Sequence, residues 1–206
     1  MATTPNLTRH LRALGRRDPH ISRGVREAGT PKSRGHAPGF PTLIRIIIDQ
    51  QVSTAAGLAI WRKLEAVCDG KVDARVLLDL GHAKLRANGF SNQKANYALG
   101  VAEAVRDGAL DFDVLETLDD DAVRSALTAL KGIGPWSADI YLMFAMGRPD
   151  IWPVGDLALQ HGARLLMNLR KKPTPERLDK IGEAWRPYRS SAALMLWHYY
   201  GFRTRR

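Results

Sequence analysis

The sequence predicts an all-α protein, and three observations favour this fold class. Apolar residues recur three or four positions apart in one segment after another. Capping residues, some of them followed by proline, precede these segments. Strand-like alternation is scarce, and no glycine-rich strand–turn–helix signal for nucleotide binding is present. Since 45% of the 206 residues are hydrophobic, the chain can form one domain or two small lobes that share a core.

The first two helices are expected to begin with the same signal, a capping residue followed by proline. These pairs are Thr4-Pro5 and Asp18-Pro19. Leucines at helical spacing follow the first pair, namely Leu7, Leu11 and Leu14. The stretch before Asp18 is rich in arginine and poor in acids, as a transit peptide would be. We favour the alternative, a first helix of the domain with an exposed basic face.

A loop is expected over residues 30–39, which are rich in turn-forming residues. The strongly apolar segment after it, from Leu43 to Ile48, has two interpretations. Its β-branched isoleucines would suit a strand. The chain continues from Ala55 to Leu64 with helical periodicity, so we expect two successive helices, the first running to Gln50-Gln51.

The remaining helices are predicted from their caps and their periodicity. Asp73, Ser91 and Asp119 each stand where an N-cap is expected, and the helix after Ser91 ends near Gly108. Further helices are expected at residues 136–146, 156–169, 175–184 and 187–200. No internal repeat and no low-complexity tract interrupts this pattern.

The charge distribution indicates an anionic partner. The formal net charge is +10, and the excess lies at the two ends. Residues 1–40 carry 8 basic and 2 acidic side chains, and residues 161–206 carry 11 and 3, whereas the middle of the chain carries 12 and 16. A basic excess of this size is typical of nucleic-acid-binding proteins. Solubility alone is the other explanation.

Several classes of protein are disfavoured. The single cysteine, Cys68, excludes an intramolecular disulfide, a four-cysteine iron–sulfur cluster and a cysteine-rich zinc site. No apolar run reaches the roughly 18 residues that span a bilayer, and the N-terminus lacks the apolar region of a secretory signal. The six histidines show no metal-ligand spacing. We therefore expect an intracellular protein with no membrane partner.

The most informative segment runs from Leu130 to Ala138, where two glycines enclose Ile133 and a new helix starts behind a proline. Glycine permits positive φ and lets another backbone approach closely. The new helix start leaves backbone N–H groups unpaired at the positive end of the helix dipole, which suits a DNA phosphate. Ile133 is expected to fill the gap between the two helices. An ordinary tight turn between helices is the alternative.

At these residues the sequence resembles a known family. Leu130, Gly132-Ile133-Gly134, Trp136 and Ala138, followed by Pro153-Val154-Gly155-Asp156, look like the helix-hairpin-helix/Gly-Pro-Asp superfamily of DNA glycosylases. Four further segments resemble DNA-3-methyladenine glycosylase II, namely residues 48–53, Phe90-Ser91 with Lys94, residues 185–192 and Leu196-Trp197. The resemblance covers roughly residues 40–200.

The resemblance implies that Asp156 is the catalytic residue. Its position alone, before an apolar helix, favours an N-cap. A carboxylate there also suits cleavage of an N-glycosidic bond, because it stabilises positive charge on the sugar and orients the attacking water. Trp136 stands where bifunctional relatives carry a lysine nucleophile, so we expect no lyase activity. Lys131 departs from the proline usual in the family.

The resemblance also implies a pocket for a flipped base. Its expected residues are Trp136, Tyr188, Ile140 and Trp152. Ile140 replaces a tyrosine of some relatives, and core packing is an equal alternative for Tyr188. For Trp185 and Trp197 we favour core packing.

DNA contacts are expected from the hairpin and from one wedge residue. The resemblance implies that Gln51 fills the gap left by the flipped base, with Gln50 beside it, although helix capping would also explain this pair. The hairpin residues are Gly132, Ile133, Gly134, Trp136 and Ser137. The backbone carbonyls of Thr128, Leu130 and Ile133 resemble a structural K⁺ or Na⁺ site of the family. Catalysis itself is expected to need no cofactor.

Taken together, these features predict one all-α glycosylase domain over residues 1–206, with an active-site cleft between two lobes. One lobe comprises residues 1–40 and 157–206, and the other residues 41–156, with the helix-hairpin-helix at residues 120–147. The expected activity is hydrolysis of alkylated purines such as 3-methyladenine and 7-methylguanine from double-stranded DNA, by a monomer in the cytoplasm or nucleoid of a bacterium or in a eukaryotic nucleus. A glycosylase for uracil, hypoxanthine or mismatched bases, a non-catalytic DNA-binding module and an RNA-binding protein are the alternatives.

Overall fold

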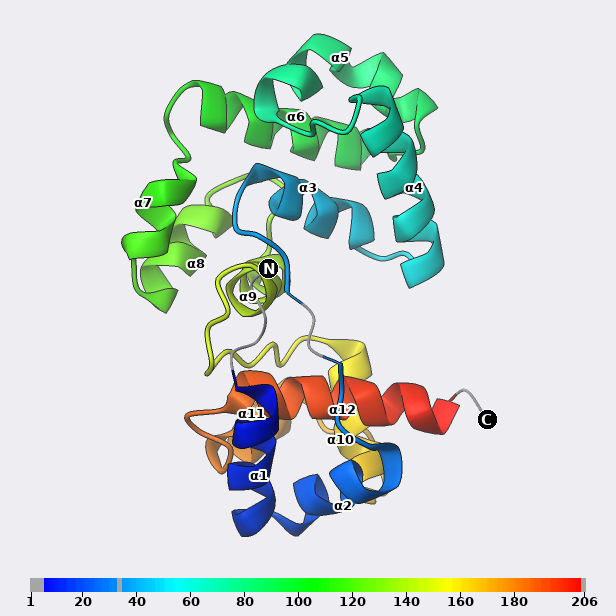
Figure 1. The fold of residues 1–206 in the computed structure, drawn as a ribbon, viewed down its shortest axis with the longest axis vertical. Coiled ribbons are helices and arrows are strands. Elements are labelled where there is room, and N and C mark those ends of the chain that lie inside the picture. The colour runs from blue at the N-terminus through cyan, green and yellow to red at the C-terminus, as the bar shows by residue number, and fades with distance from the viewer. Residues whose placement is uncertain (1–5, 33–34, 205–206) are drawn as a thin grey trace. The chain divides into compact units, whose positions relative to one another are not determined.

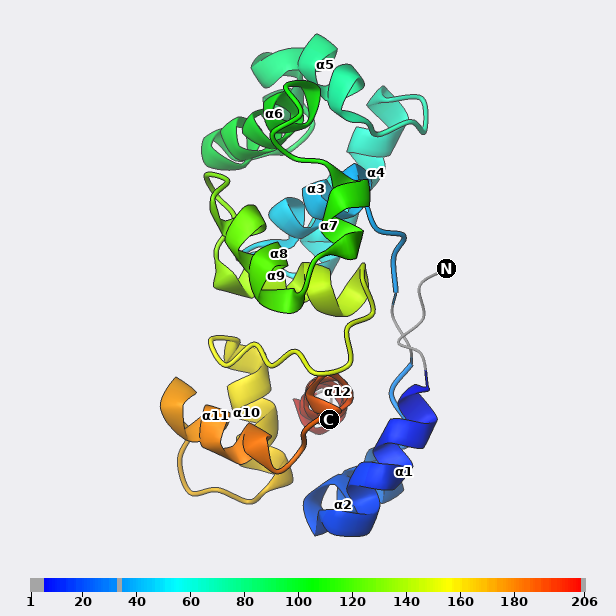
Figure 2. The same ribbon diagram turned by 90° about the vertical axis from the view of Figure 1, so that its left-hand side faces the viewer.

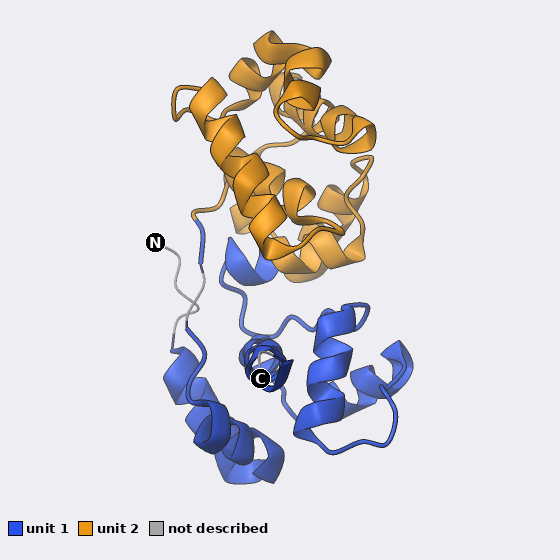
Figure 3. Cartoon of the chain, turned by 90° about the vertical axis from the view of Figure 1, so that its right-hand side faces the viewer, with its two compact units in different colours: residues 1–36, 142–206 blue, residues 37–141 orange. Residues whose placement is uncertain are grey.

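The computed structural model describes residues 6–32 and 35–204, and within these ranges all regular structure is α-helical, as the sequence predicts (Figure 1). The expected helix start at Thr4-Pro5 lies outside the described residues. The chain divides into two compact units (Figure 3). Unit 1 comprises residues 1–36 and 142–206, and unit 2 comprises residues 37–141.

Unit 2 is built around a largely buried helix. Its helices are α3 (Phe40–Asp49), α4 (Thr54–Val67), α5 (Ala74–Ala87), α6 (Asn92–Arg106), α7 (Phe112–Thr117), α8 (Asp120–Thr128) and the first part of α9 (Pro135–Phe144). The isoleucines of α3 are buried, and α3 packs against α4 and α6. Burial of most of its surface thus explains why this segment is strongly apolar, and the helical interpretation of it is confirmed.

Side-chain caps define where the helices of unit 2 begin. Each capping oxygen accepts a backbone N–H of the first turn, at Ser53, Asp73, Ser91, Asp111 and Asp119. Among them, the predicted caps Asp73, Ser91 and Asp119 are confirmed. The helix after Asp73 has non-helical backbone at Gly81, whose φ is 67°, so it consists of two short helical segments. The short helix α7 was not expected from the sequence.

Unit 1 is arranged around its last helix. Its helices are α1 (Leu7–Arg17), α2 (Pro19–Ala28), α10 (Leu157–Leu166), α11 (Pro175–Glu183), α12 (Arg189–Thr204) and the end of α9. α12 packs against α10, α2 and α1, so that it lies between the α1–α2 pair and the α10–α11 pair (Figure 2). The side chain of Asp18 caps α2 by accepting the amides of His20 and Ile21, as its position predicts.

The segment before α10 belongs to unit 1, whereas the sequence analysis groups residues 142–156 with the other lobe. Hydrogen bonds to the start of α12 account for this difference. The Arg189 guanidinium donates to the Asp150 carboxylate at 3.0 Å. The Ser190 hydroxyl donates to the Arg148 carbonyl at 2.7 Å and accepts the Ile151 amide at 2.9 Å. These contacts join residues about 40 positions apart, which no local pattern reveals.

The close approach of α10 and α12 depends on Gly162. A Cβ atom at this position would collide with the backbone carbonyl of Leu196. Backbone atoms in the middle of a helix cannot move aside cheaply, so the contact requires glycine. By contrast, Gly201 of α12 has no neighbouring atom within 4 Å of the corresponding position.

We therefore predict that Gly162→Ala lowers the free energy of unfolding by about 1–3 kcal/mol, the usual cost of overpacking. Gly201→Ala is the matched control, and it raises stability by about 0.5–1 kcal/mol because alanine favours an exposed helix. Urea unfolding of both variants measures the difference. Equal stability of the two variants would contradict the close contact of α10 and α12.

Candidate functional site

Asp156 stands at the start of α10 and is held there by two donors. Its Oδ1 atom accepts the backbone N–H of Leu159 at 2.6 Å, which is the N-cap bond that its sequence position predicts. The same oxygen accepts the indole N–H of Trp197, from α12, at 2.9 Å. The carboxylate is half-buried. Two donors and the positive end of the helix dipole therefore compensate a negative charge at a fixed place.

The loop that leads to Asp156 is braced from both sides. The side-chain amide of Gln160, itself buried, donates to the carbonyl of Val154 at 2.8 Å. The ammonium of Lys172 in turn donates to Gln160 Oε1 at 2.7 Å. The Asp156 amide closes the turn by donating to the Pro153 carbonyl at 3.0 Å. The position of the carboxylate thus depends on contacts from α10 and from the loop after it.

Trp152, which precedes this loop, lies in the core of unit 1. Its indole N–H donates to the Leu178 carbonyl at 3.0 Å, and its ring meets that of Trp185 edge to face, with 5.3 Å between centroids. Trp152 therefore anchors the start of the loop. Trp185 is fully buried and donates to Asp18 Oδ2 at 2.6 Å, in keeping with the core role expected for it.

Trp197 contacts the candidate catalytic carboxylate, which the sequence does not predict. It was expected to pack in the core, yet its half-buried indole bonds the Asp156 carboxylate. Phe144 stacks on the same ring at a centroid distance of 6.0 Å. The only signal in the sequence was the family-like pair Leu196-Trp197, because periodicity cannot tell which atom an indole N–H will meet.

Tyr188, just before α12, is half-buried and has one face of its ring covered. His10 of α1 stacks on it at a centroid distance of 4.1 Å with ring planes 18° apart. Partial burial and the charge of Arg9 lower the pKa of His10, which favours the neutral imidazole. In its neutral form, the His10 ring adds no positive charge beside Tyr188.

The hairpin lies in unit 2, between α8 and α9. Gly132 has a φ of 92°, and a Cβ on it would collide with the ring of Tyr97. The Ile133 side chain is only 4% exposed, which confirms its expected burial, and its amide donates to the Leu130 carbonyl at 3.1 Å. Gly134 is exposed, with no atom within 4 Å of its Cβ position. Gly132 and Ile133 therefore shape the turn, and Gly134 offers room for an approaching backbone.

An ion pair connects the two helices of the hairpin. The Arg124 guanidinium of α8 donates to the carboxylate of Asp139 in α9 at 2.7 Å and to Asp121 at 2.7 Å. Burial alone would lower the pKa of Arg124, but the hydrogen bond and charge of Asp139 outweigh it and raise the pKa. This ion pair holds α8 and α9 together, and Gly134 in the loop between them is exposed.

The two glutamines of the predicted wedge have different environments. Gln50 donates through Nε2 to the Gly132 carbonyl at 2.9 Å and to the Ser137 hydroxyl at 3.0 Å. Gln51 is exposed and has a φ of 52°. The Lys94 ammonium donates to the Ile48 carbonyl at 2.7 Å and so caps the end of α3. Desolvation lowers the pKa of Lys94, while the charge of Asp49 opposes this shift. Gln50 thus braces the turn after α3 against the hairpin, and Gln51 projects from that turn.

The predicted site residues are divided between the two units. Trp136 and Ile140 stand one helical turn apart on α9 of unit 2 and are both half-buried, and Ser137 is buried beside Gln50. Asp156 and Tyr188 belong to unit 1.

The predicted cation site consists of backbone carbonyl oxygens at the end of α8 and in the turn after it. Thr128 is the last residue of α8, at the negative end of the helix dipole, and Leu130 and Ile133 follow in the turn. Neutral carbonyl oxygens at such a place suit a monovalent cation, so the residues fit K⁺ or Na⁺. Within residues 6–32 and 35–204, no group of three or more His, Cys, Asp or Glu side chains is arranged to hold a metal ion.

Comparisons with known proteins agree with this geometry. The family profile described as "HhH-GPD superfamily base excision DNA repair protein" matches residues 44–187. DNA-3-methyladenine glycosylase 1 of Schizosaccharomyces pombe is 32% identical over 161 residues, which cover 77% of this chain and 71% of that protein. The match to the YfjP protein of Bacillus subtilis is 27% identical over 82% of this chain and 61% of that protein.

Solved structures show the same fold over nearly the whole chain. A 3-methyladenine DNA glycosylase of fission yeast in complex with abasic DNA superposes with a TM-score of 0.86 at 29% identity, covering 92% of this chain and 95% of that one. A DNA-3-methyladenine glycosidase of Bacillus halodurans gives a TM-score of 0.79 at 33% identity, over 95% and 91%. The chain therefore belongs to the HhH-GPD superfamily of base excision DNA repair proteins. None of its described helices is long and apolar enough to cross a bilayer.

We predict that Gln50→Ala lowers the free energy of unfolding by about 1–3 kcal/mol, because it removes two partly buried hydrogen bonds. Gln51→Ala is the matched control, and its effect stays within about 0.5 kcal/mol because the side chain is exposed. Denaturant unfolding of both variants provides the measurement. A larger loss for Gln51→Ala than for Gln50→Ala would refute the division of roles between bracing and projecting residues.

Proposed function

We propose that this chain is a monofunctional DNA glycosylase that hydrolyses the N-glycosidic bond of alkylated purines in duplex DNA and leaves an abasic site. The observation that carries the proposal is the Asp156 carboxylate, fixed at the start of α10 by the Leu159 amide and the Trp197 indole. The family profile spans this residue, and similar proteins are named for 3-methyladenine.

The chemistry follows from a carboxylate held in one place. The target base must first leave the stack, because its sugar carbon is inaccessible within the duplex. As the bond between C1′ and the purine nitrogen breaks, its electron pair leaves with the base and positive charge develops on the sugar. The charge of Asp156 stabilises this cation. Water then adds through its oxygen to C1′ and releases a proton, which the same carboxylate accepts.

Trp136 supports both the specificity and the type of reaction. It occupies the family's lysine position and cannot form a Schiff base, so base release is not followed by strand cleavage. Its indole offers a π-face to a cationic base such as 3-methyladenine, an attraction of about 0.5–2 kcal/mol. A cationic base is also a good leaving group, and no general acid is needed. Ile140, one turn further along α9, forms an aliphatic part of the same surface.

The hairpin and the wedge provide the DNA contacts in this proposal. The exposed Gly134 and the first amides of α9 bind a backbone phosphate at the positive end of the helix. A K⁺ or Na⁺ ion on the carbonyls of Thr128, Leu130 and Ile133 would add positive charge toward that phosphate. Gln51 projects from the turn that Gln50 braces, and it fills the space of the flipped base. The chain acts as a monomer, inside the cell where DNA is present.

The first prediction of this proposal concerns the released base. Wild-type protein is incubated with methylated duplex, with uracil-containing duplex and with hypoxanthine-containing duplex, and released bases are identified by chromatography. We expect release of 3-methyladenine or 7-methylguanine, strand breaks only after alkali, and no covalent adduct with borohydride. Asp156→Asn retains DNA binding and loses release by at least about 100-fold, the usual scale of a lost electrostatic contribution.

Release of only uracil or hypoxanthine would indicate a related glycosylase that acts on that base. Absence of release from every duplex would favour the non-catalytic DNA-binding module. A borohydride adduct would contradict the monofunctional assignment.

The second prediction concerns Trp197 as a positioning residue. Trp197→Phe keeps an aromatic ring beside Phe144 but removes the N–H that bonds Asp156. A hydrogen bond to a charged group contributes about 1.5–3 kcal/mol, so the single-turnover rate falls about 10- to 100-fold. Affinity for abasic duplex changes less than threefold. Trp61→Phe, the same substitution in unit 2, serves as the control. An equal loss of rate in both variants would refute the role of Trp197.

A further inference from the structure

The outer face of α1 and the adjoining part of α2 form a basic surface that the proposed reaction does not use. We call Arg9, Arg12, Arg16 and Arg26 the α1–α2 arginine surface. The three arginines of α1 lie three or four positions apart on one side of the helix, opposite the buried leucines. All four arginines are exposed. The surface lies wholly within unit 1.

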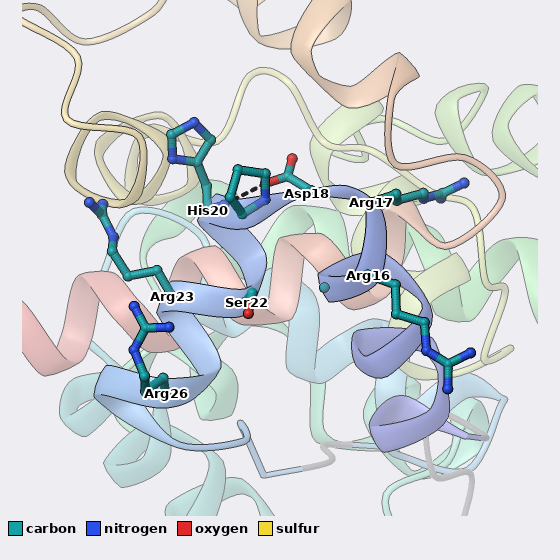
Figure 4. A pocket seen from close by; sticks show the side chains of 9 residues that line it. Arg16, Arg17, Asp18, His20, Ser22, Arg23 and Arg26 are labelled. Carbon is teal, nitrogen blue, oxygen red and sulfur yellow. Dashed lines mark hydrogen bonds between the residues drawn. The ribbon is translucent and has the colours of Figure 1, made fainter.

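The surface continues into an open pocket at the corner between the two helices. The pocket has a volume of about 520 Å³, and its lining includes Arg16, Arg17, His20, Arg23 and Arg26 (Figure 4). Arg16 and Arg17 come from the end of α1, whereas Arg23 and Arg26 extend from α2 (Figure 4). Arg17 and Arg23 are engaged within unit 1, because they donate to the carbonyls of Arg186 and Leu166.

In the described part of the chain, the two carboxylates of this segment form no ion pair with the four arginines of the surface. Asp18 Oδ1 accepts the amides of His20 and Ile21, and its Oδ2 accepts the Trp185 indole N–H. Glu27 accepts the Tyr199 hydroxyl at 2.6 Å and lies 3.7 Å from Arg23. The Tyr199 hydrogen bond and the surrounding arginines, Arg26 among them, lower the pKa of Glu27.

Pairing distinguishes these arginines from others in the protein. Arg124, Arg186 and Arg189 each form an ion pair with a carboxylate. Within the described residues, Arg9, Arg12, Arg16 and Arg26 form no hydrogen bond or ion pair. Unpaired guanidinium groups are well suited to bidentate bonds with phosphate oxygens.

The spacing of the arginines favours a polyanion over a single phosphate. Arg9 and Arg16 are seven residues apart, which places them roughly 10 Å apart along the helix. One phosphate cannot reach both, whereas duplex DNA carries a charge about every 1.7 Å of its axis. A membrane surface would need apolar anchors beside the arginines, and the large exposed apolar residues of the described chain, Val52, Leu58, Val114 and Leu157, all lie outside α1 and α2.

We propose that the α1–α2 arginine surface is a second contact site for the DNA backbone, separate from the hairpin, which binds duplex DNA irrespective of damage. The inference rests on the proposed function only in taking DNA as the polyanion. Contacts to phosphates carry no sequence or lesion information and are sensitive to salt. The surface therefore increases the time that the protein stays on undamaged duplex.

The test uses the full chain and an undamaged fluorescent duplex. In the test variant, Arg9→Gln, Arg12→Gln, Arg16→Gln and Arg26→Gln are combined. The matched control combines Arg170→Gln, Lys171→Gln, Arg177→Gln and Lys180→Gln, which removes the same charge from exposed residues of unit 1 in α11 and in the loop before it. In Figure 2, α11 and the α1–α2 pair lie on opposite sides of α12. Fluorescence anisotropy at several salt concentrations gives the dissociation constant and its salt slope, and thermal unfolding verifies that both variants fold.

The test variant is expected to bind at least tenfold more weakly at low salt. Its slope of log K against log salt becomes shallower by about 0.9 for each lost phosphate contact, up to about 3.6 for four. The control changes the slope by less than 1. Equal changes in both variants would overturn the proposal, since net charge alone would explain them. Unchanged duplex binding with lost binding to phosphatidylglycerol vesicles would also overturn it and assign the surface to lipid. Neither outcome depends on base release.

Discussion

The hydrogen bond from the Trp197 indole to the Asp156 carboxylate joins the start of α10 to α12, and much of unit 1 follows from this link. It requires the two helices to run close together, which Gly162 permits at Leu196. It also requires the preceding loop to arrive at a fixed place, which the contacts of Trp152 and Gln160 ensure. A carboxylate with two donors on one oxygen is held in orientation without losing its charge, which is what stabilisation of a sugar cation demands.

In unit 2, too, polar contacts inside the unit fix the backbone beside the candidate site residues. Gln50, Lys94 and the pair of Arg124 with Asp139 use their polar atoms inside the unit. Gln51 and Gly134 are left exposed beside them. Supporting residues thus fix the backbone, and the neighbouring positions are left to meet the ligand. In the proposed function, this arrangement lets a hairpin with little side-chain charge bind a phosphate through backbone N–H groups.

Much of the fold could be predicted from the sequence because its signals are local. The caps at Asp18, Ser91 and Asp119 and the leucine spacing in α1 depend only on nearby residues. The family-like spacing of the hairpin and of Asp156 indicates the family from the sequence alone. The sequence does not predict the short helix α7, because six residues contain too few turns to show helical periodicity.

Long-range contacts set the limit of sequence reasoning. The role of Trp197 depends on Asp156, which is 41 positions away. The different environments of Gln50 and Gln51 depend on Gly132, which is 82 positions from Gln50. The grouping of residues 142–156 with unit 1 depends on Arg189 and Ser190 in the same way. The charge excess at the chain ends was visible in the sequence, but only the structure separates paired arginines from unpaired ones.

The central claim is that Asp156 stabilises positive charge on the sugar, and a transition-state mimic tests it most directly. The measurement compares the affinities for two duplexes, one with a cationic pyrrolidine in place of the sugar and one with a neutral tetrahydrofuran. The account predicts that the wild-type protein prefers the cationic duplex by at least about tenfold, or 1.4 kcal/mol, and that Asp156→Asn abolishes this preference. An equal preference in the wild-type protein and the variant would contradict the account.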